Sequence, residues 1–146
     1  MRVSEVMKRD VHLARPDESI RDAAREMADI DAGVLPVADG DRLVGMITDR
    51  DIAIRAVALG KSPDTKVREV MSAEVKYCFE DEDLDHVVSN LGDLRIRRLP
   101  VMNRDKRLVG IVSLGDVARK DDATNIGQTV TRVSTPGGKH DQTIAH

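Results

Sequence analysis

The chain has 146 residues, of which 40% are hydrophobic and 34% are charged, and its net charge at pH 7 is −3. This length is enough for one compact domain or for two small half-domains that share a core. A slightly acidic chain with one tyrosine, one phenylalanine and no tryptophan lacks the positive field and stacking rings of nucleic-acid-binding proteins. The sequence has no apolar run as long as a membrane span, and its first residues do not resemble a signal peptide. We therefore expect neither nucleic acid nor a membrane as a partner.

Cys78 is the single cysteine of the sequence, which excludes an internal disulfide and fits a reducing, cytoplasmic location. No histidine pattern accompanies it. We therefore expect a small buried hydrophobe at this position rather than a nucleophile.

The first half of the chain predicts the order short strand, helix, strand, strand, helix. Residues 34–37 and 43–47 are short apolar runs, and the Asp and Gly residues of 38–42 favour a hairpin turn between them. Because proline donates no ladder hydrogen bond, we expect Pro36 and its counterpart Pro100 at a strand start or on an edge strand. An amphipathic helix precedes these strands, and its apolar stripe consists of Ile20, Ala23, Ala24, Met27 and Ile30.

A second helix is predicted over residues 49–59. A helix that is apolar on two sides has more surface to bury than one sheet covers, which indicates self-association through helices. Glycine and proline then end the helix, so that residues 59–66 form a linker. The two apolar sides are Ile52, Ala56 and Leu59 on one and Ile54 and Val57 on the other.

The pattern of the first half returns in the second half. With an offset of 64 residues, Leu35-Pro36-Val37 matches Leu99-Pro100-Val101. Residues 2–58 and 67–120 are therefore two copies of one unit. Residues 121–146 are polar without a periodic apolar face, which predicts a mobile tail or an arm that lies on a partner. The helical stripe of the second copy is Leu84, Val87, Val88, Leu91 and Leu94.

One short motif ends each copy, where a buried strand leads into a helix. It reads Thr48-Asp49-Arg50-Asp51 in the first copy and Ser113-Leu114-Gly115-Asp116 in the second. A helix N-terminus carries unpaired N–H groups and partial positive charge, so the hydroxyl can help hold a phosphate while the aspartate accepts bonds from a ribose. The same residues also fit a capping box. Because Asp is shorter than Glu or Gln, we expect it to reach back poorly and to leave its carboxylate for a ligand.

The duplicated unit resembles the cystathionine-β-synthase (CBS) domain over residues 2–120. Each copy has Val-Met near its start, Leu-Pro-Val in its middle and Leu-Val-Gly followed by Thr/Ser-x-x-Asp at its end. Two such units in tandem are similar to a Bateman module. The resemblance implies an α+β fold in which two β-α-β-β-α repeats pack about a pseudo-two-fold axis. It also implies homodimers through helices and two clefts for AMP, ADP, ATP, NAD or S-adenosylmethionine.

The resemblance further implies that each cleft takes its Thr/Ser and Asp from one repeat and its base pocket from the other. Cations at positions 50, 76 and 97 suggest that cleft A holds the more highly charged nucleotide. The matching positions of cleft B are Gly115, His12 and Gly33, so B is expected to bind weakly, bind a less charged adenosyl group or stand empty. Cleft A would use Thr48, Arg50, Asp51, Val75, Lys76, Ile96 and Arg97, and cleft B would use Ser113, Asp116, Val11, His12, Ala32 and Gly33.

The predicted function is a stand-alone regulatory module that binds an adenine nucleotide and acts as an energy or stress sensor. No catalytic dyad or metal-ligand cluster stands out in the sequence, so we expect no enzymatic activity, no metal and no required cofactor. The expected partners are the nucleotide, a second copy of the chain and an unidentified downstream protein. One alternative is a structural or protein-interaction module with vacant clefts. Another is an enzyme that uses Cys78 or a carboxylate.

Overall fold

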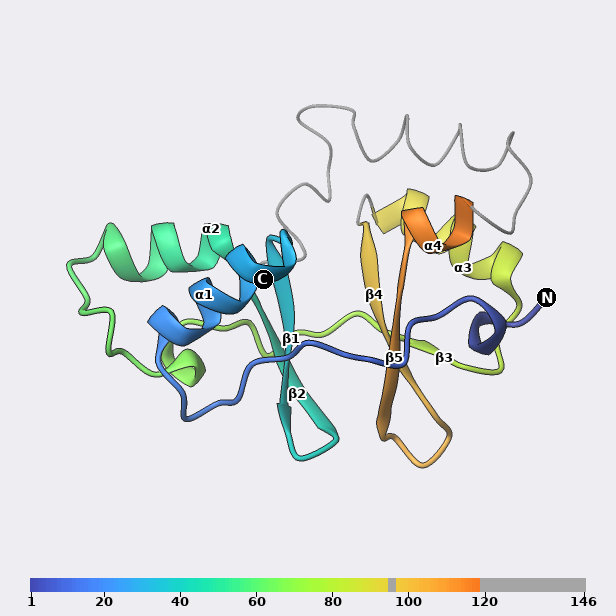
Figure 1. Ribbon diagram of the computed structural model, residues 1–146, viewed down its shortest axis with the longest axis horizontal. Coiled ribbons are helices and arrows are strands. Elements are labelled where there is room, and N and C mark those ends of the chain that lie inside the picture. The colour runs from blue at the N-terminus through green and yellow to red at the C-terminus, as the bar shows by residue number, and fades with distance from the viewer. Residues whose placement is uncertain (95–96, 119–146) are drawn as a thin grey trace. The chain divides into compact units, whose positions relative to one another are not determined.

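The computed structural model describes residues 1–94 and 97–118 (Figure 1). The described residues form two compact units, one from Met1–Val11 with the described residues between 76 and 118, and one from His12–Val75. Each unit combines short helices with one small sheet, which confirms the mixed α+β class. None of the described helices is long and apolar enough to cross a membrane. The tail predicted over residues 121–146 lies outside the described residues.

The unit of residues 12–75 contains an antiparallel two-stranded sheet, a bulge between Val37 and Ala38, and helices beside it (Figure 1). Its first helix begins at an N-cap, since the Ser19 hydroxyl accepts the Asp22 N–H at 3.1 Å. The elements are α1 (Ile20–Ile30), β1 (Val34–Asp39), β2 (Arg42–Thr48), α2 (Asp49–Asp51), the π-helix η2 (Ile52–Val57) and the short 3-10 helix η3 (Val67–Glu69).

The other unit contains a three-stranded sheet in the order β3-β4-β5, with β4 in the centre. β3 runs parallel to β4, and β5 runs antiparallel to it. The first copy of the repeat has only the isolated bridge between Ala14 and Val37 where β3 stands in the second copy. The elements are the 3-10 helix η1 (Val3–Glu5), β3 (Cys78–Phe79), α3 (Leu84–Leu94), β4 (Arg98–Met102), β5 (Leu108–Ser113) and α4 (Leu114–Ala118).

The described side chains of the two apolar stripes lie in the cores as predicted, with two exceptions in the first copy, and the side chain of Leu94 lies outside the described residues. Ala24 is exposed and Ile30 is only partly buried. In the second predicted helix, Ala56 is fully buried but Leu59 is 69% exposed, because η2 ends at Val57 and the chain turns there. The other buried members of the two stripes are Ile20, Ala23, Met27, Leu84, Val87, Val88 and Leu91.

The expectation that the prolines lie at a strand start or on an edge strand is wrong for Pro100, whereas Pro36 lies in β1, an edge strand of its two-stranded sheet. Pro100 is buried in the middle of β4, the central strand of its sheet. Its partner Ile111 exchanges both of its backbone hydrogen bonds with Lys8, at 2.9 Å each. The backbone groups of Ile111 therefore point away from β4, and Pro100 faces a position of β5 that needs no N–H donor. Pro36 is paired in the same way with Met46, which exchanges its bonds with Ser72.

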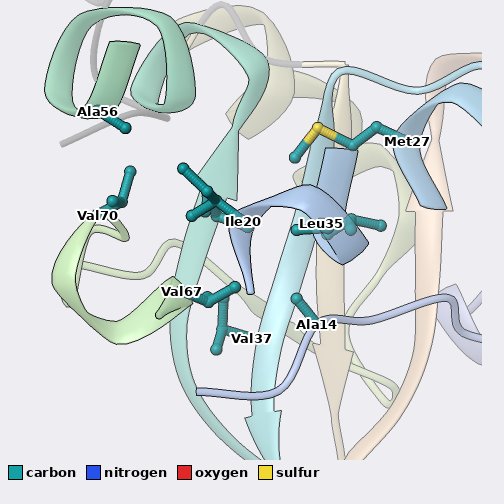
Figure 2. Packing of buried hydrophobic residues seen from close by; sticks show 10 residues of the cluster. Ala14, Ile20, Met27, Leu35, Val37, Ala56, Val67 and Val70 are labelled. Atoms are coloured by element: carbon teal, nitrogen blue, oxygen red, sulfur yellow. The ribbon is translucent and has the colours of Figure 1, made fainter. Parts of the chain in front are cut away.

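The start of each sequence copy packs into the body of the other copy. The Val67 N–H bonds to the Glu18 carbonyl at 2.9 Å, and the equivalent Val3 N–H bonds to the Glu82 carbonyl at 3.0 Å. Val67 and Val70 are fully buried in the core of the unit of residues 12–75, where Figure 2 shows Val67 beside Val37. Apolar residues at the start of one copy thus complete the core around the helices and strands of the other.

Candidate functional site

The Thr48 motif lies where β2 ends and α2 begins, and it forms a reciprocal capping box. The Thr48 Oγ1 accepts the Asp51 N–H at 2.9 Å, and the Asp51 Oδ2 accepts the Thr48 N–H at 3.0 Å. Thr48 is 4% exposed and Asp51 is 1% exposed. The second carboxylate oxygen of Asp51, Oδ1, lies 3.7 Å from the Nε of Arg55. A buried carboxylate is stabilised here by one backbone donor and one nearby guanidinium.

The Ser113 motif repeats this geometry at the junction of β5 and α4. The Ser113 Oγ accepts the Asp116 N–H at 3.2 Å, and the Asp116 Oδ2 accepts the Ser113 N–H at 3.1 Å. Asp116 is also buried, and its Oδ1 lies 3.7 Å from the Nζ of Lys8. The expectation that an aspartate reaches back poorly is therefore wrong in both motifs. The short side chain reaches the backbone because the residue is held in the first turn of the helix.

The capping geometry limits what each motif can offer to a ligand. One carboxylate oxygen is engaged with the backbone of its own motif, and the hydroxyl oxygen already accepts one N–H. A hydroxyl keeps its own proton as a donor, so it can still bond to a phosphate oxygen. The other carboxylate oxygen, Oδ1, lies on the side of the cation in both motifs, and in Asp51 it is buried.

Sequence reasoning missed both cations that neighbour the buried carboxylates. Arg55 lies four residues after Asp51, and the i,i+4 spacing on a helix is a signal that could have found it. Lys8 is more than one hundred residues away from Asp116 along the chain. It reaches Asp116 because the backbone of Lys8 pairs with Ile111 of β5. That contact depends on tertiary structure alone.

The other residues predicted for cleft A divide between the two units. Arg50, which is exposed, and Val75, which is partly buried, belong with Thr48 and Asp51 to the unit of residues 12–75. Lys76 and the exposed Arg97 belong to the other unit, and Ile96 lies outside the described residues. The complete set for cleft A therefore stays a prediction.

The set predicted for cleft B divides in the same way. Val11 belongs with Ser113 and Asp116 to one unit, whereas His12, Ala32 and Gly33 belong to the other. The exposed His12 is a hydrogen-bond partner of Glu26, with 2.6 Å between Nδ1 and Oε1. This interaction with Glu26 favours a surface histidine held by a neighbour over a ligand contact in cleft B.

Ala32 and Gly33 line an open hollow of about 360 Å³ within the unit of residues 12–75. A Cβ atom on Gly33 would lie 2.9 Å from the Oδ2 of Asp49, so glycine lets this carboxylate approach the backbone. The exposure of Ala24 has its explanation here, since Ala24 faces the hollow instead of the core. The remaining lining residues are Met27, Ala28, Asp31 and Ile52.

Cys78 lies at the start of β3 and is buried. Burial, followed by the nearby Glu82 carboxylate, raises the pKa of its thiol to about 12. A thiol with this pKa is protonated at neutral pH and is a poor nucleophile. Among the described residues, no group of three or more His, Cys, Asp or Glu side chains is placed to hold a metal ion.

The model of the CBS domain family matches this chain twice, at residues 3–57 and 67–122. These matches cover both copies of the repeat, each with its Thr/Ser-x-x-Asp motif. The chain belongs to the CBS domain family. It contains two CBS domains in tandem, and its mixed α+β fold matches that of solved CBS-pair proteins.

Similar CBS proteins include the CBS domain-containing protein YhcV of Bacillus subtilis (strain 168). It is 36% identical to this chain over 133 residues, which cover 90% of this chain and 94% of YhcV. The crystal structure of Hypoxic Response Protein I with two coordinated zinc ions has a TM-score of 0.74 and 33% identity. The likeness covers 84% of this chain and all of that one (100%).

A second similar structure contains adenosyl ligands. The CBS domain pair of protein MJ0100, in complex with 5′-methylthioadenosine and S-adenosyl-L-methionine, has a TM-score of 0.69 and 32% identity. The likeness covers 82% of this chain and 98% of that one. Solved structures similar to this chain therefore include one with adenosyl compounds and one with zinc.

Proposed function

We propose that this CBS pair is a non-enzymatic regulatory module that binds an adenine nucleotide and senses the energy or stress state of the cell. The observation that carries the proposal is the buried aspartate at each strand-to-helix junction. Asp51 and Asp116 each keep one carboxylate oxygen beside a cation, at 3.7 Å in both cases. The adenosyl ligands of the MJ0100 CBS pair support the same class of ligand.

The proposed binding mode assigns one part of the nucleotide to each group of the motif. The ribose hydroxyls donate to Oδ1 of the aspartate, the oxygen that lies beside the cation. The hydroxyl of Thr48 or Ser113 donates to a phosphate oxygen. Arg50, Lys76 and Arg97 serve the phosphates of cleft A, and Arg and Lys form strong charge-assisted bonds to such groups.

Regulation requires that the ligand has different affinities for two states of the protein. In the proposed sensor, an occupied cleft changes the affinity for a second copy or for a downstream protein. The exposed apolar residues at the end of the second helix support self-association in the cytoplasm, since Ile54, Val57 and Leu59 are 51%, 69% and 69% exposed.

A second candidate function is a structural or protein-interaction module whose clefts stay vacant. One observation favours it: the capping boxes use both the hydroxyl oxygens and one carboxylate oxygen of each motif in structural bonds. In this case Thr48 and Asp51 stabilise the start of the helix and have no ligand.

Calorimetric titration with AMP, ADP, ATP, NAD and S-adenosylmethionine distinguishes the two candidates. Asp51→Asn and Asp116→Asn retain an oxygen for the capping bond but remove the negative charge, so they test binding with little loss of folding. The matched control is Asp29→Asn, which changes an exposed aspartate of α1 that does not line the hollow. A micromolar dissociation constant, about −8 kcal/mol, that is weakened by Asp51→Asn or Asp116→Asn but not by the control supports the sensor. Flat titrations with all five ligands would refute the sensor and support the interaction module with vacant clefts.

A further inference from the structure

Lys8 is held beside the second motif by its backbone. Its N–H and carbonyl each bond to Ile111 at 2.9 Å, two residues before Ser113 on β5. From this position the Nζ lies 3.7 Å from Oδ1 of Asp116. The side chain of Lys8 is 64% exposed, whereas that of Asp116 is 2% exposed. A solvated ammonium therefore lies beside one oxygen of a buried carboxylate.

The first motif has a different cation in a different place. Ser72 stands where Lys8 stands in the other unit, and its hydroxyl accepts the Glu74 N–H at 3.2 Å. The carboxylate of Asp51 instead faces Arg55. Nη1 of Arg55 also donates to two backbone carbonyls at 3.4 Å each, so that this guanidinium is tied to the protein. Lys8, by contrast, has a flexible stem and a compact charge that can move toward a ligand.

The capping box determines the direction from which a ligand can reach Asp116. Oδ2 accepts the Ser113 N–H, and Oδ1 lies 3.7 Å from the Lys8 Nζ, so a ligand hydroxyl that bonds to Oδ1 lies beside the ammonium. A ligand that also carries an anionic group gains a charge-assisted bond from this lysine. A neutral ligand gains little, and a cationic group is repelled.

We propose that Lys8 determines the charge preference of the Asp116 site, favouring adenosyl ligands that carry phosphate over neutral or cationic ones. This inference rests on the proposed nucleotide-binding function and adds the ligand class of one site. It also replaces the expectation that cleft B is poor in cations, which followed from positions 12, 33 and 115 alone. Lys8 is not one of those positions, and its equivalent in the second copy is Ser72.

The test compares wild-type protein with Lys8→Ser and Lys8→Arg by calorimetry against adenosine, AMP, ADP, ATP and S-adenosylmethionine. Lys8→Ser introduces the residue found at the equivalent position 72. The matched control is Lys61→Ser, because Lys61 is an exposed lysine of the other unit and its replacement changes the net charge equally. All titrations are repeated at high salt, which screens exposed charges.

We expect Lys8→Ser to weaken the binding of AMP, ADP and ATP by about fivefold to tenfold, because it removes a charge-assisted bond at a partly exposed site. The affinity for adenosine should change by less than about twofold, and the affinity for S-adenosylmethionine should not fall. High salt should remove most of the difference in nucleotide affinity between the wild type and Lys8→Ser. Lys8→Arg and Lys61→Ser should bind like the wild type.

Two results overturn the inference. If the wild type binds nucleotides and Lys8→Ser weakens adenosine as much as AMP, or weakens neither, Lys8 does not determine charge preference and the nucleotide-binding function stands. If the wild type binds none of the five ligands and does not bind NAD, both proposals are wrong. The wild-type titration alone therefore separates failure of the function from failure of the role of Lys8.

Discussion

Replacement of Asp51 tests how much the capping box contributes to stability. Asp51→Ala removes the acceptor of the buried Thr48 N–H, which lies 3.0 Å from Oδ2. A hydrogen bond to a charged group contributes about 1.5 to 3 kcal/mol, and an exposed cap only about 0.5 to 2 kcal/mol. Because Asp51 is 1% exposed, the upper part of this range applies. We expect a loss of about 2 to 3 kcal/mol.

Two further variants separate geometry from charge. Asp51→Asn can still accept the Thr48 N–H but loses the ionic attraction to Arg55, so we expect a loss of about 1 kcal/mol. Asp49→Ala changes an exposed residue of the same turn and should change the free energy of unfolding by about 0.5 kcal/mol or less. Urea unfolding followed by circular dichroism measures all three variants. A loss below about 0.5 kcal/mol for Asp51→Ala would refute the reasoning, since the buried bond would then contribute no more than a surface contact.

Three further predictions concern other parts of the chain. Gly110→Ala should lower the free energy of unfolding in urea by about 1 to 3 kcal/mol, because its Cβ would lie 2.9 Å from the Lys8 carbonyl oxygen. Gly115→Ala, whose Cβ would have its nearest contact at 3.7 Å, should not destabilise the protein. Stability should fall between about pH 9 and pH 12, because Cys78 keeps its proton in the folded state up to a pKa of about 12, whereas the unfolded thiol loses its proton near 9.0. Thermal melts of the wild type should show this fall, and melts of Cys78→Ala should lack the part that comes from the thiol. Replacing Ile54 and Val57 with Glu should reduce self-association in analytical ultracentrifugation, and an unchanged assembly would exclude this surface as the interface.

The periodicity of the sequence was sufficient to predict most of the secondary structure. The helix α3 and the strands β1 and β2 lie where the apolar pattern places them. The helix buries one stripe, and each strand buries four consecutive residues, as a short apolar run predicts. The prediction for Pro100 is wrong because the preference of proline for edge strands treats all positions of a central strand alike. The structure shows that a single strand position can lack a hydrogen-bonding partner and accept proline in a central strand.

The candidate site shows the same division between local and distant information. The sequence identified Thr48, Asp51, Ser113 and Asp116, because the hydroxyl and the acid are only three residues apart and their relation is local. It underestimated the reach of the aspartates, whose geometry depends on the dihedral angles of the first helical turn.

The sequence by itself determined the family, the two copies and the two motifs, because the apolar pattern and the motif spacing repeat along the chain. Tertiary structure alone decided that the start of each copy packs into the core of the other, and that Lys8 lies beside Asp116. The physical reason is that backbone pairing between distant segments brings side chains together regardless of their separation along the chain. No local pattern encodes the charge that such pairing places beside a buried carboxylate.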